Sequence, residues 1–189
     1  LFLFPTTATS FYRYDRGWKK VYKNELSSIE RAMIKKAIKE SLKEIKYLAP
    51  LKTYGPVVED RRTQVTFSAL GQDVVKVLGE RGVKLKKEWR DKNTSIKLKL
   101  AEALQKRLPN LEVGTAGYTS IDVTHKGIDK EYGIKQVKKY LHISTRDMLF
   151  VGDALFPGGN DSAVLRTGVI CFEVKEIEDT KKLIRYLLQ

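Results

Sequence analysis

Oxygen-bearing side chains gather in one stretch of the sequence, at the point where a strand is expected to end. An apolar run at 148–151 leads to Asp153, and Asn160 and Asp161 follow the turn-forming residues 157–159. Open α/β sheets place their sites at the carboxyl ends of strands, so these side chains should converge there. Carboxylate and amide oxygens suit Mg²⁺, which also binds substrate phosphate oxygens. The same pattern fits a strand, loop and helix in which Asn160 or Asp161 only caps the helix.

The second half of the chain alternates apolar strands with helices. Residues 148–151 and 169–172 are apolar throughout, and helical patterns cover residues 130–141, 160–166 and 180–188. Continuous apolar strands that alternate with helices indicate a parallel sheet covered on both faces. We therefore predict an α/β core in this part of the chain.

The middle of the chain has the pattern of an α+β layer. Ser27 and Glu30 form a capping box at the start of a long amphipathic helix, and residues 94–107 predict a second helix that ends before Pro109. Residues 71–87 contain glycines and no steady period, so we expect irregular structure or a short helix followed by a loop. Strands are expected at 57–58, 65–70, 111–115 and 119–123.

These patterns predict an α/β fold interrupted by an insertion. Residues 1–21 should supply one core strand and a hairpin, and residues 22–118 the inserted α+β domain. Residues 119–189 should then form the C-terminal half of the core.

Composition excludes several classes of protein. The 42% hydrophobic content supports a real core, and no apolar run approaches the about 20 residues that span a bilayer. The single cysteine, Cys171, excludes an intramolecular disulfide framework, and we expect a cytoplasmic protein. The net charge of +13 favours anionic partners, but the lysines are mixed with glutamates, which is typical of solvated helix faces.

Several motifs, in the right order, resemble those of the haloacid dehalogenase (HAD) superfamily. The similarity is to the branch with a large α/β cap, subfamily IIB, which includes eukaryotic-type phosphomannomutases and sugar-phosphate phosphatases. The segments that carry it are Phe4-Pro5-Thr6-Thr7, residues 59–68, Ser120-Ile121-Asp122-Val123, Gly127-Ile128-Asp129-Lys130 and Gly152-Asp153 with Pro157-Gly158-Gly159-Asn160-Asp161. The resemblance implies a Rossmann-like parallel-sheet core, with residues 22–118 as its inserted cap.

The resemblance also implies catalytic and metal-binding roles in the core. Lys130 would neutralise the phosphoryl charge, and Asp153 would hold Mg²⁺. Asn160 and Asp161 would complete the metal site, or cap the helix and orient Asp153 from behind.

Substrate-binding roles are implied for four residues of the cap and its last strand. Arg61 would bind a substrate phosphate, since guanidinium geometry suits phosphate, and its neighbour Arg62 lies on the opposite strand face, so only one should face the cleft. Ser120 and Asp122 resemble sugar-hydroxyl contacts. They fit equally well the solvent-facing side of an alternating strand.

Two departures from the family pattern affect the expected activity. HAD enzymes use an Asp-x-Asp motif as nucleophile and general acid–base, and no Asp-x-Asp occurs in this chain. We expect that strand to precede residue 1, so that this chain alone is inactive and the full-length form is an enzyme. Gln72 stands where a second cap arginine is expected, which disfavours a mutase that must grip both phosphates of a bisphosphate.

The sequence therefore predicts a Mg²⁺-dependent HAD-type phosphohydrolase that acts on a phosphorylated sugar or similar small metabolite. One alternative is a phosphomannomutase-like phosphosugar mutase. Another is a truncated, non-catalytic homologue that binds phosphate ligands or a partner chain, with self-association through an exposed sheet edge. Nucleic-acid binding through charge is a third, and it predicts an affinity that falls steeply with salt.

Overall fold

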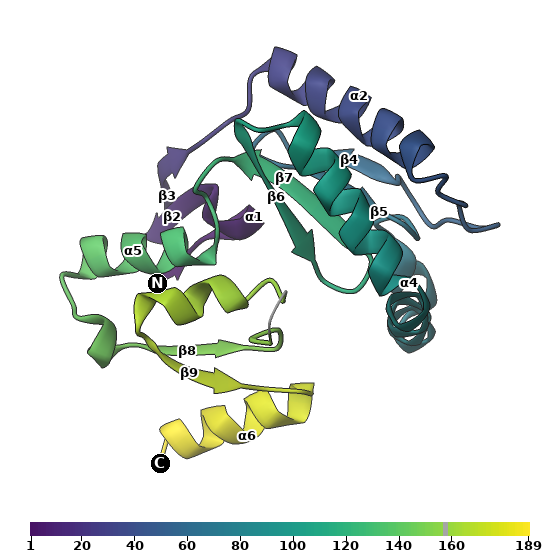
Figure 1. Cartoon of the computed structure of the whole chain (residues 1–189). Helices are drawn as coiled ribbons and strands as arrows, with labels where there is room; N and C mark the ends of the chain where they lie inside the picture. The colour runs from purple at the N-terminus through teal and green to yellow at the C-terminus, as the bar shows by residue number, and fades with distance from the viewer. Residues whose placement is uncertain (157–158) are drawn as a thin grey trace. The chain divides into compact units, whose positions relative to one another are not determined.

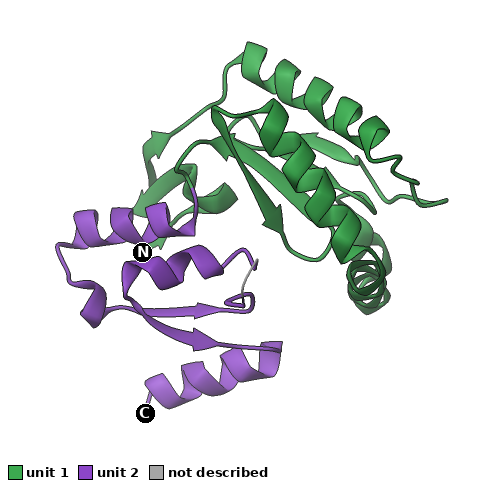
Figure 2. Cartoon of the chain, viewed as in Figure 1, with its two compact units in different colours: residues 1–128 green, residues 129–189 purple. Residues whose placement is uncertain are grey.

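The computed structural model describes residues 1–156 and 159–189, so Pro157 and Gly158 of the expected turn lie outside the described residues. The chain divides into two compact units, unit 1 (Leu1–Ile128) and unit 2 (Asp129–Gln189), as coloured in Figure 2. Each unit is described by itself.

Unit 1 begins with a small antiparallel sheet in the order β1-β2-β3. Its buried centre is Phe11, which stacks on Phe4 with ring centroids 4.3 Å apart and meets Phe2 edge-on. The expected hairpin is present as β2 and β3. The elements are β1 (Phe2–Leu3), α1 (Pro5–Ala8), β2 (Ser10–Tyr14) and β3 (Trp18–Lys23).

The larger part of unit 1 is a four-stranded antiparallel sheet in the order β4-β5-β7-β6, with helices on one face (Figure 1). Alternation along β5 and β7 sends Val65, Phe67, Ile121 and Val123 to the helix side, where all four are buried. The elements are α2 (Ser28–Glu44), β4 (Val58–Asp60), β5 (Val65–Ser68), α3 (Val74–Leu78), α4 (Glu80–Arg107), β6 (Leu111–Ala116) and β7 (Ser120–His125).

The start of α2 agrees with the sequence analysis. Ser27 Oγ accepts the Glu30 backbone N–H (3.1 Å), and the Glu30 carboxylate accepts the Ser27 backbone N–H (2.7 Å), which forms the predicted capping box. The buried stripe of α2 runs through Ile34, Ala37 and Ile38.

Residues 71–87 are more helical than predicted. They form α3 and the first part of α4, which runs without a break from Glu80 to Arg107. A Cβ on Gly82 would lie 2.5 Å from the carbonyl oxygen of Val74, so this glycine permits close packing of α3 on α4. A residue type that usually weakens a helix is here a packing requirement.

The four-stranded sheet continues past residue 118, where the sequence analysis ended the insertion. Asp122 of β7 pairs with Thr66 of β5 on one side and with Gly114 of β6 on the other. The compact unit that contains this sheet ends at Ile128, and it also contains residues 1–21.

Unit 2 is built on two parallel strands, β8 and β9, as the apolar runs predicted. Figure 1 draws these strands between the 3₁₀ helix η2 on one side and α6 on the other. Buried Met148, Val164 and Val169 form its core, with Ile134 and Val137 of α5 packed against them. The elements are α5 (Lys130–Leu141), η1 (Thr145–Asp147), β8 (Leu149–Gly152), η2 (Ser162–Thr167), β9 (Ile170–Glu173) and α6 (Ile177–Leu187).

The described helices include no candidate for a membrane-spanning segment. None of those within residues 1–156 and 159–189 combines the length and the apolar character that a bilayer span requires.

Candidate active site

Unit 2 joins Lys130 to Asp161 by an ion pair. The Lys130 ammonium donates to Asp161 Oδ1, and the Asp161 side chain is only 1% exposed. Lys130 is the first residue of α5, which begins there because Asp129 Oδ1 accepts the backbone N–H of Tyr132 (3.0 Å) as an N-cap. The cap thus fixes the position of the lysine backbone opposite the buried carboxylate.

The second oxygen of Asp161 organises the loop after β8. Asp161 Oδ2 accepts the backbone N–H groups of Asp153 (3.1 Å) and Ala154 (3.0 Å). A Cβ on Gly152 would lie 2.6 Å from this oxygen, so only glycine lets the carboxylate approach the end of the strand. Likewise, a Cβ on Gly159 would lie 2.1 Å from the carbonyl oxygen of Ala154. Gly152 therefore makes room for the Asp161 carboxylate, and Gly159 for the backbone of the loop after β8.

Asp153 and Asn160 have the free oxygens that a hard cation needs. Within the described part of the chain, neither side chain has a hydrogen bond or ion pair, and the Asp153 carboxylate is exposed at the carboxyl end of β8. Mg²⁺ is commonly held by one or two carboxylates, with water and substrate phosphate as its other ligands. Asp153 fits that ion, and Asn160 can add an amide oxygen.

Asp161, which the sequence analysis considered as a third metal ligand or as a residue that orients Asp153, is already engaged by protein donors. Both of its oxygens already accept, from the Lys130 ammonium and from the two backbone N–H groups. It fits the alternative of a buried group that orients its neighbours. Among the described residues, no three His, Cys, Asp or Glu side chains are arranged so that they could together hold a metal ion.

Arg61 and Arg62 lie next to each other at the β4–β5 turn of unit 1, but their side chains bind different carboxylates. Arg61 binds Glu59, with Nε 2.7 Å and Nη2 2.6 Å from Oε2, whereas Arg62 has a positive φ of 68° and its Nη2 lies 3.1 Å from Glu25. Both side chains are exposed. Arg61 is also close enough to Asp122 to attract its carboxylate.

Asp122 projects from the face of β7 opposite the helices, since Ile121 and Val123 on either side of it enter the core. Thr66 Oγ1 donates to its carboxylate at 2.7 Å, and Gln64 makes a further side-chain hydrogen bond to it. Burial raises the pKa of Asp122, although these hydrogen bonds and nearby Arg61 oppose the rise. A carboxylate that the fold keeps in a position where burial disfavours its charge is a candidate for ligand binding.

The surroundings of Asp122 include a hydrogen-bond acceptor without a partner among the described residues and space that no side chain fills. Gln64 is 1% exposed, and its Oε1 has no hydrogen-bond partner within the described residues. Gly114, which pairs with Asp122 across the sheet, has no atom within 4 Å of the place where a Cβ would stand. Ser120 lies two residues before Asp122 on the same face and is partly buried.

A cationic group that the sequence analysis missed lies at the β6–β7 turn. The Lys97 ammonium donates to the carbonyl oxygens of Gly117 (2.7 Å) and Ala116 (3.3 Å). Burial lowers the pKa of Lys97 to about 8, with Asp122 opposing the shift and Arg90 and Lys86 adding to it. On a lysine-rich helix, nothing in the sequence distinguishes this lysine from its neighbours.

The predicted site residues thus fall into two groups, each assembled within one unit. Unit 2 holds Lys130, Asp153, Asn160 and Asp161, and unit 1 holds Arg61, Arg62, Ser120 and Asp122. Thr66, Gln64 and Lys97 join the second group only through the fold.

A family model describes the chain almost from end to end. The model of the eukaryotic phosphomannomutases matches residues 2–189. The chain belongs to the eukaryotic phosphomannomutase family. This match spans both units of the phosphomannomutase homologue, and with it the resemblance to HAD hydrolases is confirmed.

Solved structures agree with the phosphomannomutase assignment at the level of fold. An N-terminally truncated IMP-nucleotidase from Plasmodium falciparum with bound IMP is 12% identical, with a TM-score of 0.59 over 96% of this chain and 46% of that one. A second structure of this truncated nucleotidase gives a TM-score of 0.58 at 12% identity, over 95% of this chain and 47% of that one. The phosphomannomutase homologue thus spans about half the length of these structures, and their likeness supports the predicted fold class of an α/β core with a cap.

A subclass IIB sugar phosphatase of the HAD superfamily is 16% identical, with a TM-score of 0.49 over 93% of this chain and 65% of that one. A search of curated protein sequences found no match for this phosphomannomutase homologue.

Proposed function

We propose that the chain provides the cap and the C-terminal part of the core of a Mg²⁺-dependent phosphotransferase that hydrolyses a phosphorylated sugar or similar small metabolite. The four-stranded sheet and its helices are the cap in this proposal, and unit 2 is the part of the core. The observation that carries it is the Lys130–Asp161 pair, because the carboxylate that holds this ammonium also accepts the backbone N–H of Asp153, the proposed metal ligand.

The residues of unit 2 suit the binding of a phosphoryl group. An ammonium has three N–H donors, so Lys130 keeps two for phosphoryl oxygens after it donates to Asp161. Asp161 prevents that ammonium from swinging towards solvent and also holds the backbone of Asp153. When bound to Asp153 and Asn160, Mg²⁺ would neutralise charge on the phosphoryl oxygens. Such fixed positive charge is the main contribution of proteins to phosphoryl transfer.

The residues of unit 1 suit the hydroxyls and a phosphate of a sugar phosphate. Asp122 accepts hydrogen bonds, so in this proposal it receives sugar hydroxyls beside Ser120. Arg61 supplies a planar cation for a phosphate oxygen, although the substrate must compete with Glu59 for it. The nucleophile, an Asp-x-Asp carboxylate in the resemblance, would come from outside this sequence.

Phosphosugar mutase activity is the second candidate, and the family match favours it. Against it, Gln72 carries no charge, and its buried Nε2 has no hydrogen-bond partner among the described residues. An uncharged amide suits a hydroxyl or carbonyl group better than a second phosphate. We therefore rank hydrolysis above the mutase reaction.

The proposal is tested by metal binding and turnover on the same samples. Mg²⁺ binding is measured by calorimetry and hydrolysis by release of p-nitrophenol, for the wild type and for Lys130→Ala and Asp153→Ala. Lys138→Ala and Asp147→Ala change exposed residues of the same unit and serve as controls. We expect Asp153→Ala to abolish Mg²⁺ binding, and any turnover to fall by about 10²-fold or more in both site variants.

Two other outcomes test the site. Mg²⁺ and phosphate binding without turnover would support the proposed site in unit 2, since the nucleophile is proposed to come from outside this sequence. Metal binding that is unchanged by Asp153→Ala would overturn the proposed site.

A further inference from the structure

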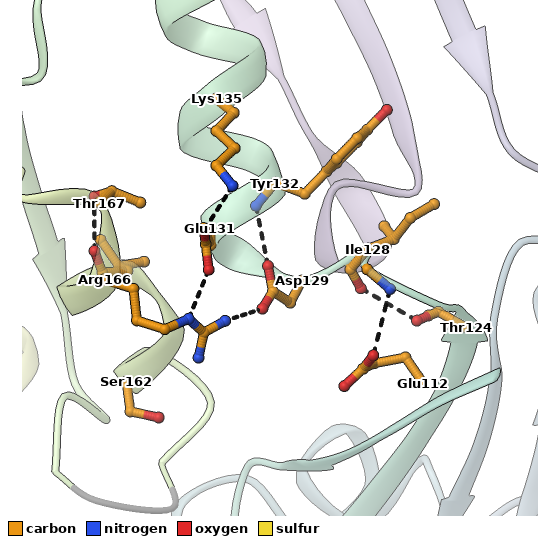
Figure 3. A network of polar contacts seen from close by, with 12 residues as sticks. Glu112, Thr124, Ile128, Asp129, Glu131, Tyr132, Lys135, Ser162, Arg166 and Thr167 are labelled. Atoms are coloured by element: carbon orange, nitrogen blue, oxygen red, sulfur yellow. Dashed lines mark hydrogen bonds and ion pairs between the residues drawn. The ribbon is translucent and has the colours of Figure 1, made fainter. Parts of the chain in front are cut away.

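Arg166 binds the residues on both sides of Lys130. Its Nη2 lies 2.5 Å from Asp129 Oδ2, and its Nε donates to Glu131 Oε2 at 2.6 Å. Figure 3 shows the guanidinium between these two carboxylates, at the start of α5. The lysine of the proposed phosphate site is thus flanked by two acids that share one arginine.

The same arginine lies on the element that carries the partner of Lys130. Arg166 belongs to η2, which begins one residue after Asp161. Val164 of η2 is fully buried in the core of unit 2 and so anchors this short helix. The Arg166 side chain therefore links the two elements from which Lys130 and Asp161 meet.

Charge balance around Lys130 depends on this arginine. Asp129, Glu131 and Asp161 supply three negative charges, and Lys130, Arg166 and Lys135 supply three positive charges. The pKa of Arg166 is raised, first by its hydrogen bond to Glu131, and the pKa of Glu131 is lowered by its hydrogen bonds to Lys135 and Arg166. Without Arg166 the set has one excess negative charge, and two carboxylates could compete with Asp161 for the ammonium.

We propose that Arg166 is a positioning residue, which keeps the Lys130 ammonium on Asp161 and available to an anionic phosphate by occupying the carboxylates on either side of it. This inference rests on the proposed function for the identity of the ligand. Its geometric part, the position of the Lys130 ammonium, does not depend on that function.

The test uses the whole chain with two readouts. The first is the ¹⁵N-edited NMR signal of the Lys130 ammonium, whose protons should exchange slowly with water in the wild type. The control Arg185→Gln, which removes an exposed arginine of α6, should keep this signal. We expect Arg166→Gln and Asp161→Asn both to lose that signal, while circular dichroism shows unit 2 of Arg166→Gln still folded. Arg166→Lys should restore it only in part, because one ammonium cannot span both carboxylates as the fork does.

The second readout is the affinity for inorganic phosphate. Arg166→Gln should weaken it about tenfold, and adding Glu131→Gln should recover most of the loss, since the extra negative charge is removed. A role in folding alone would not give this recovery. An unchanged Lys130 signal and unchanged phosphate affinity in Arg166→Gln would overturn the inference. If the wild-type chain shows the Lys130 signal, loses it in Arg166→Gln and binds no phosphate, the positioning role stands and the proposed function fails.

Discussion

Asp161 accepts the ammonium of Lys130, 31 residues earlier in the chain, while its side chain stays 1% exposed. Burial of a charged carboxylate costs free energy unless hydrogen bonds replace those to water. The Asp161 carboxylate receives such bonds from one ammonium and two backbone N–H groups. The pair therefore contributes both to the stability of unit 2 and to the geometry of the loop that presents Asp153.

Asp161→Asn should destabilise unit 2. The amide has an NH₂ on one side, so in either orientation it directs a donor at Lys130 or at the N–H groups of Asp153 and Ala154. Lys130 is partly exposed, so we expect a loss of about 2 kcal/mol rather than the full cost of breaking a buried ion pair.

The two tryptophans allow this loss to be assigned. Trp18 and Trp89 both belong to unit 1, so urea unfolding followed by tryptophan fluorescence should be unchanged in Asp161→Asn. Circular dichroism should show an earlier transition for unit 2. The matched control Asp147→Asn, an exposed change in the same unit, should shift neither, and a shift confined to fluorescence would contradict the prediction.

Gly152→Ala should disturb the same loop from the strand side. The new Cβ would lie 2.6 Å from Asp161 Oδ2 and 2.6 Å from a ring carbon of Phe150, so one or both must move. We expect a loss of about 1 to 3 kcal/mol, measured by urea unfolding of unit 2, and weaker Mg²⁺ binding. Gly114→Ala is the control, because its Cβ meets no atom within 4 Å. Equal stabilities for the two variants would show that the carboxylate does not need the glycine.

The stability of unit 1 should rise with pH because of Lys97. Its folded pKa of about 8 lies below the ordinary 10.5, so between these values the unfolded chain holds more protons than the folded one. The free energy of unfolding therefore increases with pH across that window. The side chain is partly exposed, which limits the expected gain to about 1 to 2 kcal/mol.

This pH dependence is measured as the difference between wild type and Lys97→Met in urea unfolding followed by tryptophan fluorescence. The difference cancels other titrations, such as that of Tyr47, whose pKa is raised by burial. The prediction would be refuted if the free energy of unfolding of the wild type, relative to that of Lys97→Met, did not increase as the pH rises from neutral through the window.

Asp122→Asn should stabilise unit 1 while it weakens ligand binding. Burial raises the pKa of Asp122, so the charged form is disfavoured in the fold, and an amide avoids that cost while it still accepts from Thr66. We expect a gain of about 1 kcal/mol in the free energy of unfolding, the usual scale of one substitution. Lower stability, or unchanged affinity for a sugar phosphate, would argue against a binding role for this carboxylate.

Local patterns made much of the fold predictable. The capping box gave the start of α2, the turn between β2 and β3 followed from Asp15-Arg16-Gly17, and the apolar runs identified β8 and β9 as a parallel pair. Each of these depends on neighbouring residues alone. By contrast, the role of Gly82 depends on the Val74 carbonyl oxygen, eight residues earlier in the chain. The glycines therefore led to a prediction of irregular structure, or a short helix and a loop, where α4 is in fact a continuous helix.

The candidate site was predictable only in part. Lys130, Asp153 and Asp161 stand in motifs that can be read from the sequence, but whether Asp161 binds metal or orients its neighbours depends on three donors that only the fold brings together. No sequence pattern singles out Arg166 or Gln64. The importance of Gln64 comes from its burial beside Asp122, and that of Arg166 from two carboxylates 35 and 37 residues earlier in the chain.

The single division between Ile128 and Asp129 has a consequence for synthesis. A growing chain completes every residue of unit 1, Asp122 included, before it starts the unit that carries Lys130. Lys130 then leaves the ribosome well before Asp161, so its ammonium must remain solvated until Asp161 emerges. Nascent chains arrested short of Asp161 would hold the proposed sugar-binding carboxylate but not the ion pair, so the proposed phosphate site forms only after all of unit 1 has been synthesised.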